Sequence, residues 1–256
     1  MLSVARRAIT RDILLEKKSV SVSDLAKRFD VTEETIRRDL KALEAEGFLT
    51  RTYGGAFIQD GSLNEIDVSV LQTAYVDEKK RMAEAAAELV RNGDSVYIDS
   101  STSAGFLCGY IKDRRVTVVT NSLMVLNALQ ENRNISLVSI GGKYEPSSMS
   151  FVGSEALSAL RRYFVDHAFF SCRSVSAEHG LTDANSASAA IRSLLLEQSE
   201  HTSLLADHTK FGKSSFMSVG PLSRLDNVFT DAPLSSEWQD TFSKNHVRVY
   251  ECSSGQ

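Results

Sequence analysis

The chain has 256 residues, of which 42% are hydrophobic and 24% are charged, and its mean hydropathy is -0.16. This composition is ordinary for a globular protein and excludes fibrous and intrinsically disordered chains. No segment approaches the roughly 20 consecutive apolar residues of a membrane helix, and no secretory signal is visible in residues 1–10. We therefore expect a cytoplasmic protein without a membrane span, built from a small domain attached to a medium one.

The placement of charges and cysteines bears on whether the chain binds nucleic acid or a metal. The net charge is -4, yet residues 1–56 hold 11 basic and 9 acidic side chains, so this segment is mildly basic. That excess alone is weak support for nucleic-acid binding, which has to be argued from where the charges lie. Cys108, Cys172 and Cys252 form no C-x-x-C pair and no histidine stands at ligand spacing, so we expect free thiols and neither a metal site nor a cofactor.

Three helices are expected in the first 45 residues. Apolar residues recur at helical spacing from Ala5 to Leu14 and predict the first helix. Ser21, followed three residues later by Asp24, is typical of a helix start and predicts a short second helix. Thr32 is suited to cap a third helix, whose apolar face is formed by Ile36, Leu40 and Leu43. A short helix, a brief turn and a longer helix is helix-turn-helix spacing.

The opposite face of the third helix carries side chains suited to DNA. These are Thr35, Arg37, Arg38 and Lys41. Arginine forks two donors onto a guanine edge, whereas lysine and threonine hold phosphate oxygens, so this face predicts entry into a major groove. The alternative is a solvated amphipathic helix whose charges form surface ion pairs only. Two strand-like pieces around Gly54-Gly55 predict a hairpin wing that brings Arg51 and Tyr53 near the neighbouring phosphates or minor groove.

The remaining sequence changes its periodicity. Residues 57–74 lack sustained periodicity and predict a linker or hinge between a DNA-binding domain at 1–56 and a second domain at 75–256. Helices are expected at 76–90, 102–111, 123–130, 154–163 and 186–199, and strands at 95–99, 116–119, 135–140, 149–152, 166–170, 202–206, 227–230 and 247–250. Residues 178–183 predict a polar turn. Strands and helices in alternation imply an α/β domain whose parallel sheet is covered on both faces.

Polar loops follow three of the expected strands. In open parallel sheets, ligands bind outside the carboxyl ends of the strands. Hydroxyls and free amides where a loop meets a helix suit a phosphate, although the same residues also serve as plain helix caps. The loops are Asp99-Ser100-Ser101-Thr102-Ser103, Thr120-Asn121-Ser122 and Gly141-Gly142-Lys143. For Lys143, phosphate binding and simple solvation remain equally open.

Several motifs resemble the DeoR family of bacterial transcription regulators. In the first segment they are residues 23–31, Thr35-Ile36-Arg37-Arg38-Asp39-Leu40, Leu43-Glu44 and residues 51–56; in the second they are residues 98–103, 119–122, 141–142, 152–153, 180–182, 204–207 and 210–212. The resemblance covers nearly the whole chain. It implies a winged helix-turn-helix head and an effector-sensing α/β domain similar in fold to ribose-5-phosphate isomerase. Ser101, Ser103 and Arg192 depart from the residues that many relatives carry at those places.

The resemblance implies a regulator, more readily a repressor, that binds double-stranded operator DNA and changes its grip when a phosphorylated sugar occupies the second domain. The expected effector residues are Asp99, Ser100, Ser101, Thr102, Ser103, Asn121, Lys143 and Lys210. A homodimer or homotetramer is expected, because DNA readers commonly match repeated half-sites. Two alternatives remain: an isomerase or deaminase of sugar phosphates, for which Glu178, His179 and Asp183 supply acid/base groups, and a DNA-binding head on a pure dimerisation module.

Overall fold

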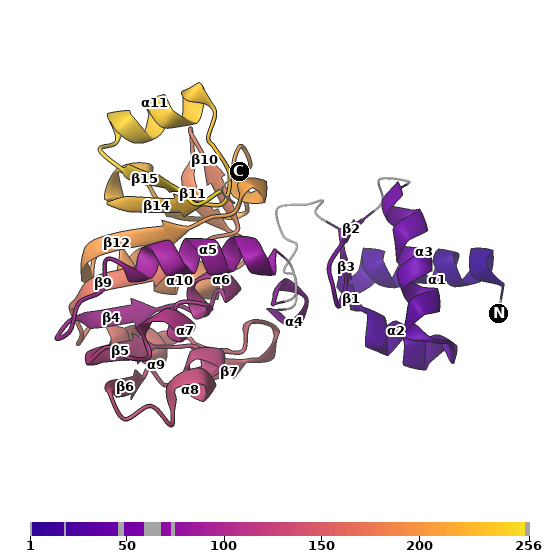
Figure 1. Ribbon diagram of the computed structural model, residues 1–256, viewed down its shortest axis with the longest axis horizontal. Helices are drawn as coiled ribbons and strands as arrows, with labels where there is room; N and C mark the ends of the chain where they lie inside the picture. The colour runs from indigo at the N-terminus through magenta and orange to yellow at the C-terminus, as the bar shows by residue number, and fades with distance from the viewer. Residues whose placement is uncertain (1, 18, 46–48, 59–67, 73–74, 254–256) are drawn as a thin grey trace. The chain divides into compact units, whose positions relative to one another are not determined.

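The structure is a computed structural model that describes residues 2–17, 19–45, 49–58, 68–72 and 75–253. The chain divides into two compact units, Met1–Val76 and Asp77–Gln256 (Figure 1). Each unit has its own hydrophobic core.

The first unit is a winged helix-turn-helix. Its helices are α1 (Ser3–Lys17), α2 (Val22–Phe29), α3 (Glu33–Ala45) and α4 (Val68–Leu71), and its strands are β1 (Ser19–Ser21), β2 (Thr50–Arg51) and β3 (Gly55–Phe57). The three strands form an antiparallel sheet in the order β1-β3-β2. The predicted cap at the second helix is confirmed, because Ser21 Oγ accepts a hydrogen bond from the Asp24 amide over 3.0 Å.

The helical stripe predicted for α3 forms the centre of this unit. Ile36, Leu40 and Leu43 are at most 1% exposed and pack with residues of α1 and α2. The spacing of apolar residues therefore predicted both the helix and its buried face.

Two predictions for the first unit are corrected. No strand was expected between the first two helices, but β1 forms there by pairing with β3, with Ser19 opposite Phe57. Phe57, expected to begin the linker, lies in β3 and packs against Leu71 of α4. Strands this short have no periodicity of their own, so only the tertiary pairing defines them. Of the predicted wing and linker, residues 47–48, 59–67 and 73–74 lie outside the described residues.

The second unit is an α/β domain around a seven-stranded parallel sheet, ordered β15-β14-β12-β9-β4-β5-β6. The sheet strands are β4 (Ser95–Ile98), β5 (Val116–Thr120), β6 (Ile135–Ser139), β9 (Val165–Phe170), β12 (Ser199–Leu205), β14 (Asn227–Thr230) and β15 (Arg248–Glu251). The helices are α5 (Val76–Ala87), α6 (Thr102–Gly105), α7 (Cys108–Ile111), α8 (Leu123–Leu129), α9 (Ser154–Leu160), α10 (Ser186–Leu195) and α11 (Ser236–Lys244). The predicted fold class is confirmed.

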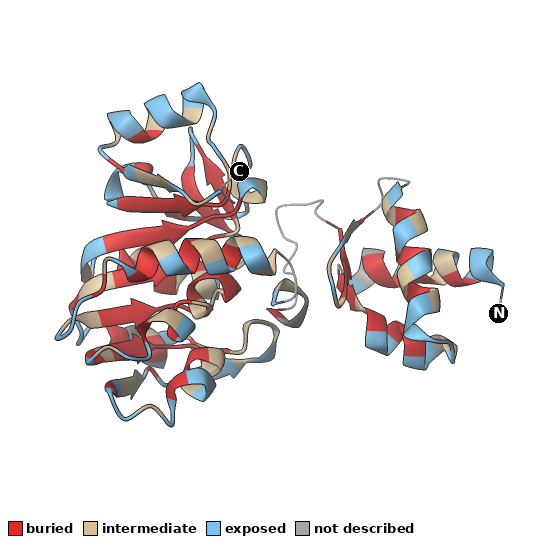
Figure 2. Ribbon diagram, viewed as in Figure 1, coloured by how far each residue is buried: buried red, intermediate tan, exposed pale blue. Residues whose placement is uncertain are grey.

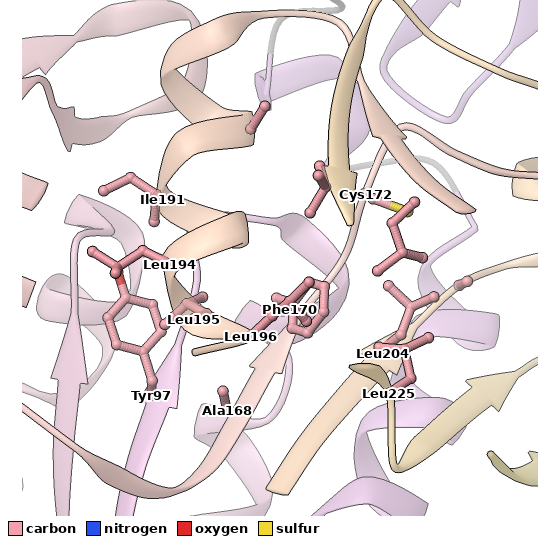
Figure 3. Close-up of a cluster of buried hydrophobic side chains, with 14 of the residues drawn as sticks. Tyr97, Ala168, Phe170, Cys172, Ile191, Leu194, Leu195, Leu196, Leu204 and Leu225 are labelled. Carbon is pink, nitrogen blue, oxygen red and sulfur yellow. The ribbon is translucent and has the colours of Figure 1, made fainter. Parts of the chain in front are cut away.

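Alternate residues of each strand enter two separate cores. Tyr97 of β4 packs on one face of the sheet, whereas its neighbours Val96 and Ile98 pack on the other, as the two-residue period of a strand requires. Helices α9, α10 and α11 cover the Tyr97 face, where Ile191 and Leu194 of α10 lie over the strands (Figure 3). Helices α5, α6, α7 and α8 cover the other face, and the buried strands lie between these two helical layers (Figure 2).

Smaller elements complete the second unit. Strands β10 (Ser174–Ser176), β11 (Gly180–Asp183) and β13 (Met217–Gly220) form an antiparallel sheet, and β7 (Lys143–Glu145) pairs with β8 (Ser150–Val152) as a hairpin. Single turns of 3-10 helix lie at Pro146–Ser148, His208–Lys210 and Leu222–Arg224. No helix of the described residues is long and apolar enough to cross a membrane.

Three local predictions for the second unit are corrected. Residues 178–183, expected as a polar turn, end in β11, which is buried and pairs with both β10 and β13. The single helix expected at 102–111 is two short helices, α6 and α7, and α11 was not predicted at all. A short polar strand such as β11, which pairs only with β10 and β13, lacks the alternation of apolar and polar residues by which a strand is recognised in a sequence.

Candidate functional site

The outward face of α3 presents basic side chains. Arg38 and Lys41 are exposed, and neither forms an ion pair with a described residue. Arg37 is already engaged, because its guanidinium lies 2.6 Å from Glu33 Oε2 and 3.8 Å from Glu34 Oε2. Thr35 is half-buried and shares a hydrogen bond with Thr32 across 3.0 Å. Arg38 and Lys41 are therefore the cations that α3 offers without first breaking an internal contact.

The wing is tied to α3 by one carboxylate. Glu44 accepts a hydrogen bond from the Arg51 backbone amide (3.0 Å) and another from the Arg51 Nε (2.6 Å). Burial works to raise the pKa of the Glu44 carboxyl, but these hydrogen bonds and the Arg51 charge outweigh it and hold that pKa below its ordinary value. Tyr53 stands at the tip of the hairpin and is 86% exposed. The terminal nitrogens of Arg51 and the Tyr53 ring are thus left for a partner.

The second candidate site lies at the carboxyl edge of the parallel sheet. Strands β4 and β9 are neighbours, and the chain leaves them in opposite directions, to β5 and β6 on one side and to β12, β14 and β15 on the other. Such a switch point is where open α/β sheets bind ligands. The loops that follow β4, β9 and β12 meet at this edge, and the Asp99 amide donates to Phe169 O over 3.1 Å.

A buried ion cluster organises the switch point. Arg192 of α10 donates from Nε to Asp99 (2.9 Å) and also pairs with Asp183 of β11. Burial opposes the charged guanidinium, yet the two carboxylates raise the pKa of Arg192 above its ordinary value. The other oxygen of Asp99 accepts from the Ser101 amide and hydroxyl. Asp99, predicted as an effector residue, is therefore neutralised and holds the loop that opens α6.

A lysine from α5 reaches the same loop. Lys79 Nζ donates to Thr102 Oγ1 over 2.9 Å, and Lys79 is 3% exposed. Burial and the nearby charge of Lys210 lower the pKa of Lys79 to about 8, although Asp207 and Glu78 work in the opposite direction. Burial works to raise the pKa of Asp207, but Lys210, Thr209 and Lys79 together hold it below its ordinary value. Lys210, a predicted effector residue, is thus part of a shared charge cluster with Lys79 and Asp207.

The other predicted effector residues take different places. Ser100 and Ser103 are buried beside Asp99, whereas the side chain of Ser101 caps α6 at the Ala104 amide. Asn121 accepts from the Tyr97 hydroxyl (2.9 Å) and donates to Phe151 O (3.1 Å), so its amide fixes the β7–β8 hairpin. Lys143 is exposed at the start of β7, and no hydrogen bond or ion pair joins it to a described residue of the cluster.

Sequence reasoning missed three cations at this edge, Lys79, Arg173 and Arg192. Lys79 shares the buried stripe of α5 with Met82, Ala83 and Ala86, and a charged residue inside an apolar stripe is the signal that marks it. Arg173 lies in the loop after β9, where no pattern singled it out. With Lys210 they make four cations, which lie near the four carboxylates Asp99, Asp183, Asp207 and Glu78.

Among the described residues, no group of three or more His, Cys, Asp or Glu side chains is placed to hold a metal ion. The three cysteines form no disulfide, and Cys108 and Cys172 are buried. Burial raises the pKa of the Cys172 thiol to about 12, so its sulfur stays protonated beside Asp183.

Comparison with known proteins assigns a family to both units. Residues 6–61 match a DeoR-like helix-turn-helix domain, and residues 74–232 match the DeoR C-terminal sensor domain. A solved ribose 5-phosphate isomerase A from Methanocaldococcus jannaschii is 18% identical and is similar over 54% of this chain and 55% of its own, with a TM-score of 0.40.

Three relatives are similar over most of their length. The HTH-type transcriptional regulator YulB of Bacillus subtilis is 36% identical over 97% of this chain and 96% of its own. The L-fucose operon activator of Haemophilus influenzae is 30% identical over 88% of this chain and 90% of its own. The glycerol-3-phosphate regulon repressor of Escherichia coli is 26% identical over 94% of this chain and 96% of its own. The chain therefore belongs to the DeoR family of helix-turn-helix transcriptional regulators.

Proposed function

We propose that the chain is a repressor whose grip on operator DNA changes when a phosphorylated sugar binds at the carboxyl edge of the parallel sheet. The gathering of Lys79, Arg173 and Lys210 at that edge carries the effector part of the proposal, because a site lined by several cations favours an anionic ligand. The relatives include a glycerol-3-phosphate regulon repressor, which supports repression as the direction of regulation. They also include an operon activator, so a reporter assay of transcription with and without the protein tests that direction.

The DNA contacts follow from the free cations of the first unit. Arg38 and Lys41 face outward from α3, and Arg37 joins them when DNA phosphate or a guanine edge replaces Glu33. Thr35 serves a phosphate at the start of the helix, while Arg51 and Tyr53 of the wing reach the adjacent backbone. A regulator with these contacts acts where the chromosome is, in the cytoplasm.

The effector contacts follow from the charge cluster of the second unit. Lys79 and Lys210 supply positive charge on either side of the hydroxyl loop at Ser100 to Ser103. Asp99, neutralised by Arg192, is compatible with an anion nearby and holds that loop in place. Asn121 acts at one remove by fixing the hairpin that carries Lys143.

The coupling between effector and DNA is proposed to run through α5. This helix begins at Val76, where the first unit ends, and its first turn carries Lys79 to the effector loop. An anion that replaces Thr102 as the hydrogen-bond partner of Lys79 shifts the position of α5. Effector and DNA then favour different states of one equilibrium, which is what allosteric linkage requires.

The DNA contacts are tested by salt and by substitution. Operator affinity of the full chain should fall with salt in proportion to the phosphates it neutralises. The double substitution Arg37→Ala and Arg38→Ala should weaken specific binding, with the exposed Arg133→Ala as the control. Unchanged operator affinity in the double variant would remove the assignment of α3.

The effector and its alternatives are tested by thermal shift. A sugar phosphate at 100 times its Kd should stabilise the chain by about 2.7 kcal/mol. No response to any sugar phosphate would favour the pure dimerisation module, and turnover of ribose-5-phosphate or glucosamine-6-phosphate would favour the enzyme. The geometry speaks against the enzyme, because Glu178 and His179 are exposed and Asp183 is buried against Arg192.

The assembly is proposed to be a homodimer or a homotetramer. A two-fold symmetric assembly matches an operator made of two half-sites. Light scattering of the full chain, with and without a duplex, measures the stoichiometry directly, and a monomer on DNA would contradict the proposal.

A further inference from the structure

Arg173 stands at the switch point of the sheet, and none of the described residues bonds to its side chain. It lies between β9 and β10, and its guanidinium forms no hydrogen bond or ion pair with any residue that the structure describes. Its side chain is only partly exposed, and burial lowers the pKa of Arg173 even though Asp183 and Asp207 favour its charge. The nearest carboxylates thus act at a distance and do not bond to it.

Those carboxylates are already engaged elsewhere. Asp183 pairs with Arg192, and Asp207 accepts hydrogen bonds from the amide and the hydroxyl of Thr209. A partly buried arginine keeps five donors that nothing in the described fold satisfies. A ligand oxyanion is the group that fits them, because arginine forks onto planar or tetrahedral oxyanions.

A second polar group in the same loop is also unmatched. Ser171 is 3% exposed, and its buried Oγ has no hydrogen-bond partner in the described structure. A buried hydroxyl without a hydrogen-bond partner is rare and costs stability, so it indicates a position where a ligand or a water molecule binds. The residues around it are held firmly, since Cys172 Sγ donates to Ser174 O and Ser174 shares a hydrogen bond with Ser215.

We propose that Arg173 and Ser171 bind the phosphate group of the effector, with Lys210 facing it from the loop after β12. This inference rests on the proposed function and assigns the phosphate to the β9 loop. The Ser100 to Ser103 loop after β4 is then left for the hydroxyl end of the sugar. The assignment makes Arg173 a specificity residue for phosphorylated over unphosphorylated ligands.

Inorganic phosphate titrated into the full chain by calorimetry tests the assignment. Arg173→Ala should weaken phosphate binding about tenfold or more, and Ser171→Ala should weaken it by a smaller factor. Arg173→Lys should restore part of the affinity, because it returns the charge without the fork. The exposed Arg133→Ala is the matched control and should bind phosphate as the unaltered chain does.

Thermal stability separates a ligand role from a structural one. Without phosphate, Arg173→Ala should melt at the same temperature as the unaltered chain or higher, because it removes a partly buried cation that has no bonded partner. With phosphate, the unaltered chain should gain stability and the variant should not. A variant that melts lower without phosphate and gains as much with it would overturn the proposal.

Two further outcomes separate this inference from the proposed function. If the unaltered chain and Arg173→Ala bind phosphate equally, the assignment of Arg173 is wrong while the effector site stands. If neither phosphate nor any sugar phosphate binds the unaltered chain, both are wrong. Gluconate, a sugar carboxylate, serves as the other probe: binding that depends on Arg173 for gluconate and not for phosphate would overturn the choice of phosphate.

Discussion

Arg6 of α1 and Asp39 of α3 form an ion pair whose side chains are only 7% and 6% exposed. Arg6→Ala would leave the Asp39 carboxylate buried without this cation, which costs about 3–5 kcal/mol of unfolding free energy. Urea unfolding followed by the helical signal of the first unit measures the loss. The control is Arg37→Ala, which breaks an exposed pair with Glu33 and should cost about 1 kcal/mol or less. Equal midpoints for the two variants would contradict a supporting role for the buried pair.

Glu44 is expected to act on DNA through Arg51. Because Glu44 holds both the backbone and the Nε of Arg51, Glu44→Ala frees the wing arginine and should weaken operator binding by about 1 kcal/mol. Glu44→Gln keeps an acceptor for the Arg51 amide, so its operator affinity should lie between those of the unaltered chain and Glu44→Ala. Fluorescence anisotropy with an operator duplex measures each affinity. If Glu44→Ala binds DNA more tightly than the unaltered chain, the carboxylate acts by repelling phosphate and not by positioning Arg51.

Gly55 is expected to tolerate no side chain. A Cβ at this position would lie 2.1 Å from Val20 O in β1, so Gly55→Ala must separate β1 from β3. Several kcal/mol of stability in the first unit should be lost, since backbone cannot move aside as a flexible side chain does. Gly109→Ala in α7 is the control, because its Cβ meets nothing within 4 Å and alanine favours a helix. A folded, DNA-binding Gly55→Ala variant would argue against the close approach of the two strands.

The affinity for phosphate is expected to fall as the pH rises above about 8. Burial lowers the pKa of Lys79 to about 8, and a bound anion stabilises the charged amine, so the anion binds the protonated form better. Calorimetry between pH 7.5 and 9.5 should show this decline, and Lys79→Arg should abolish it because arginine stays charged. The exposed neighbour Lys80→Ala should keep the unaltered profile. A flat profile in the unaltered chain would remove Lys79 from the site.

The same group affects stability in the opposite sense. Without an anion, Lys79 takes up a proton on unfolding between pH 8 and its ordinary value of 10.5. The unfolded state then binds more protons, so the contribution of Lys79 to the unfolding free energy rises with pH across that window.

The sequence predicted the helix-turn-helix and the parallel sheet because both depend on local periodicity. The stripe of Ile36, Leu40 and Leu43 and the apolar strand at 166–170 each show their buried face without knowledge of the partner. Strands β1, β10 and β13 escaped prediction because they are short and exist only through pairing with distant segments.

The sequence predicted the location of the candidate site, at the carboxyl edge of the parallel sheet, but only some of its residues. The loops after β4 and β12 lie at the same edge of the sheet; Asp99 was predicted from its position after a strand, and Lys210 from the family resemblance. Arg192, which pairs with Asp99, and Lys79, which donates to Thr102, come from helices distant in sequence, and no spacing rule joins them to these loops. Arg173 could not be predicted from the sequence, because only the structure shows that this cation has no bonded partner among the described residues.

The central claim is that a phosphorylated sugar controls the grip on DNA, and anisotropy of labelled duplexes from the DNA flanking the chain's own gene tests it most directly. We expect specific binding in the range of about 10⁻⁸ M or tighter at physiological salt. One sugar phosphate should change that affinity about tenfold or more, while its unphosphorylated sugar leaves the affinity unchanged. Operator binding that no sugar phosphate alters, or that the free sugar alters equally, would contradict the account.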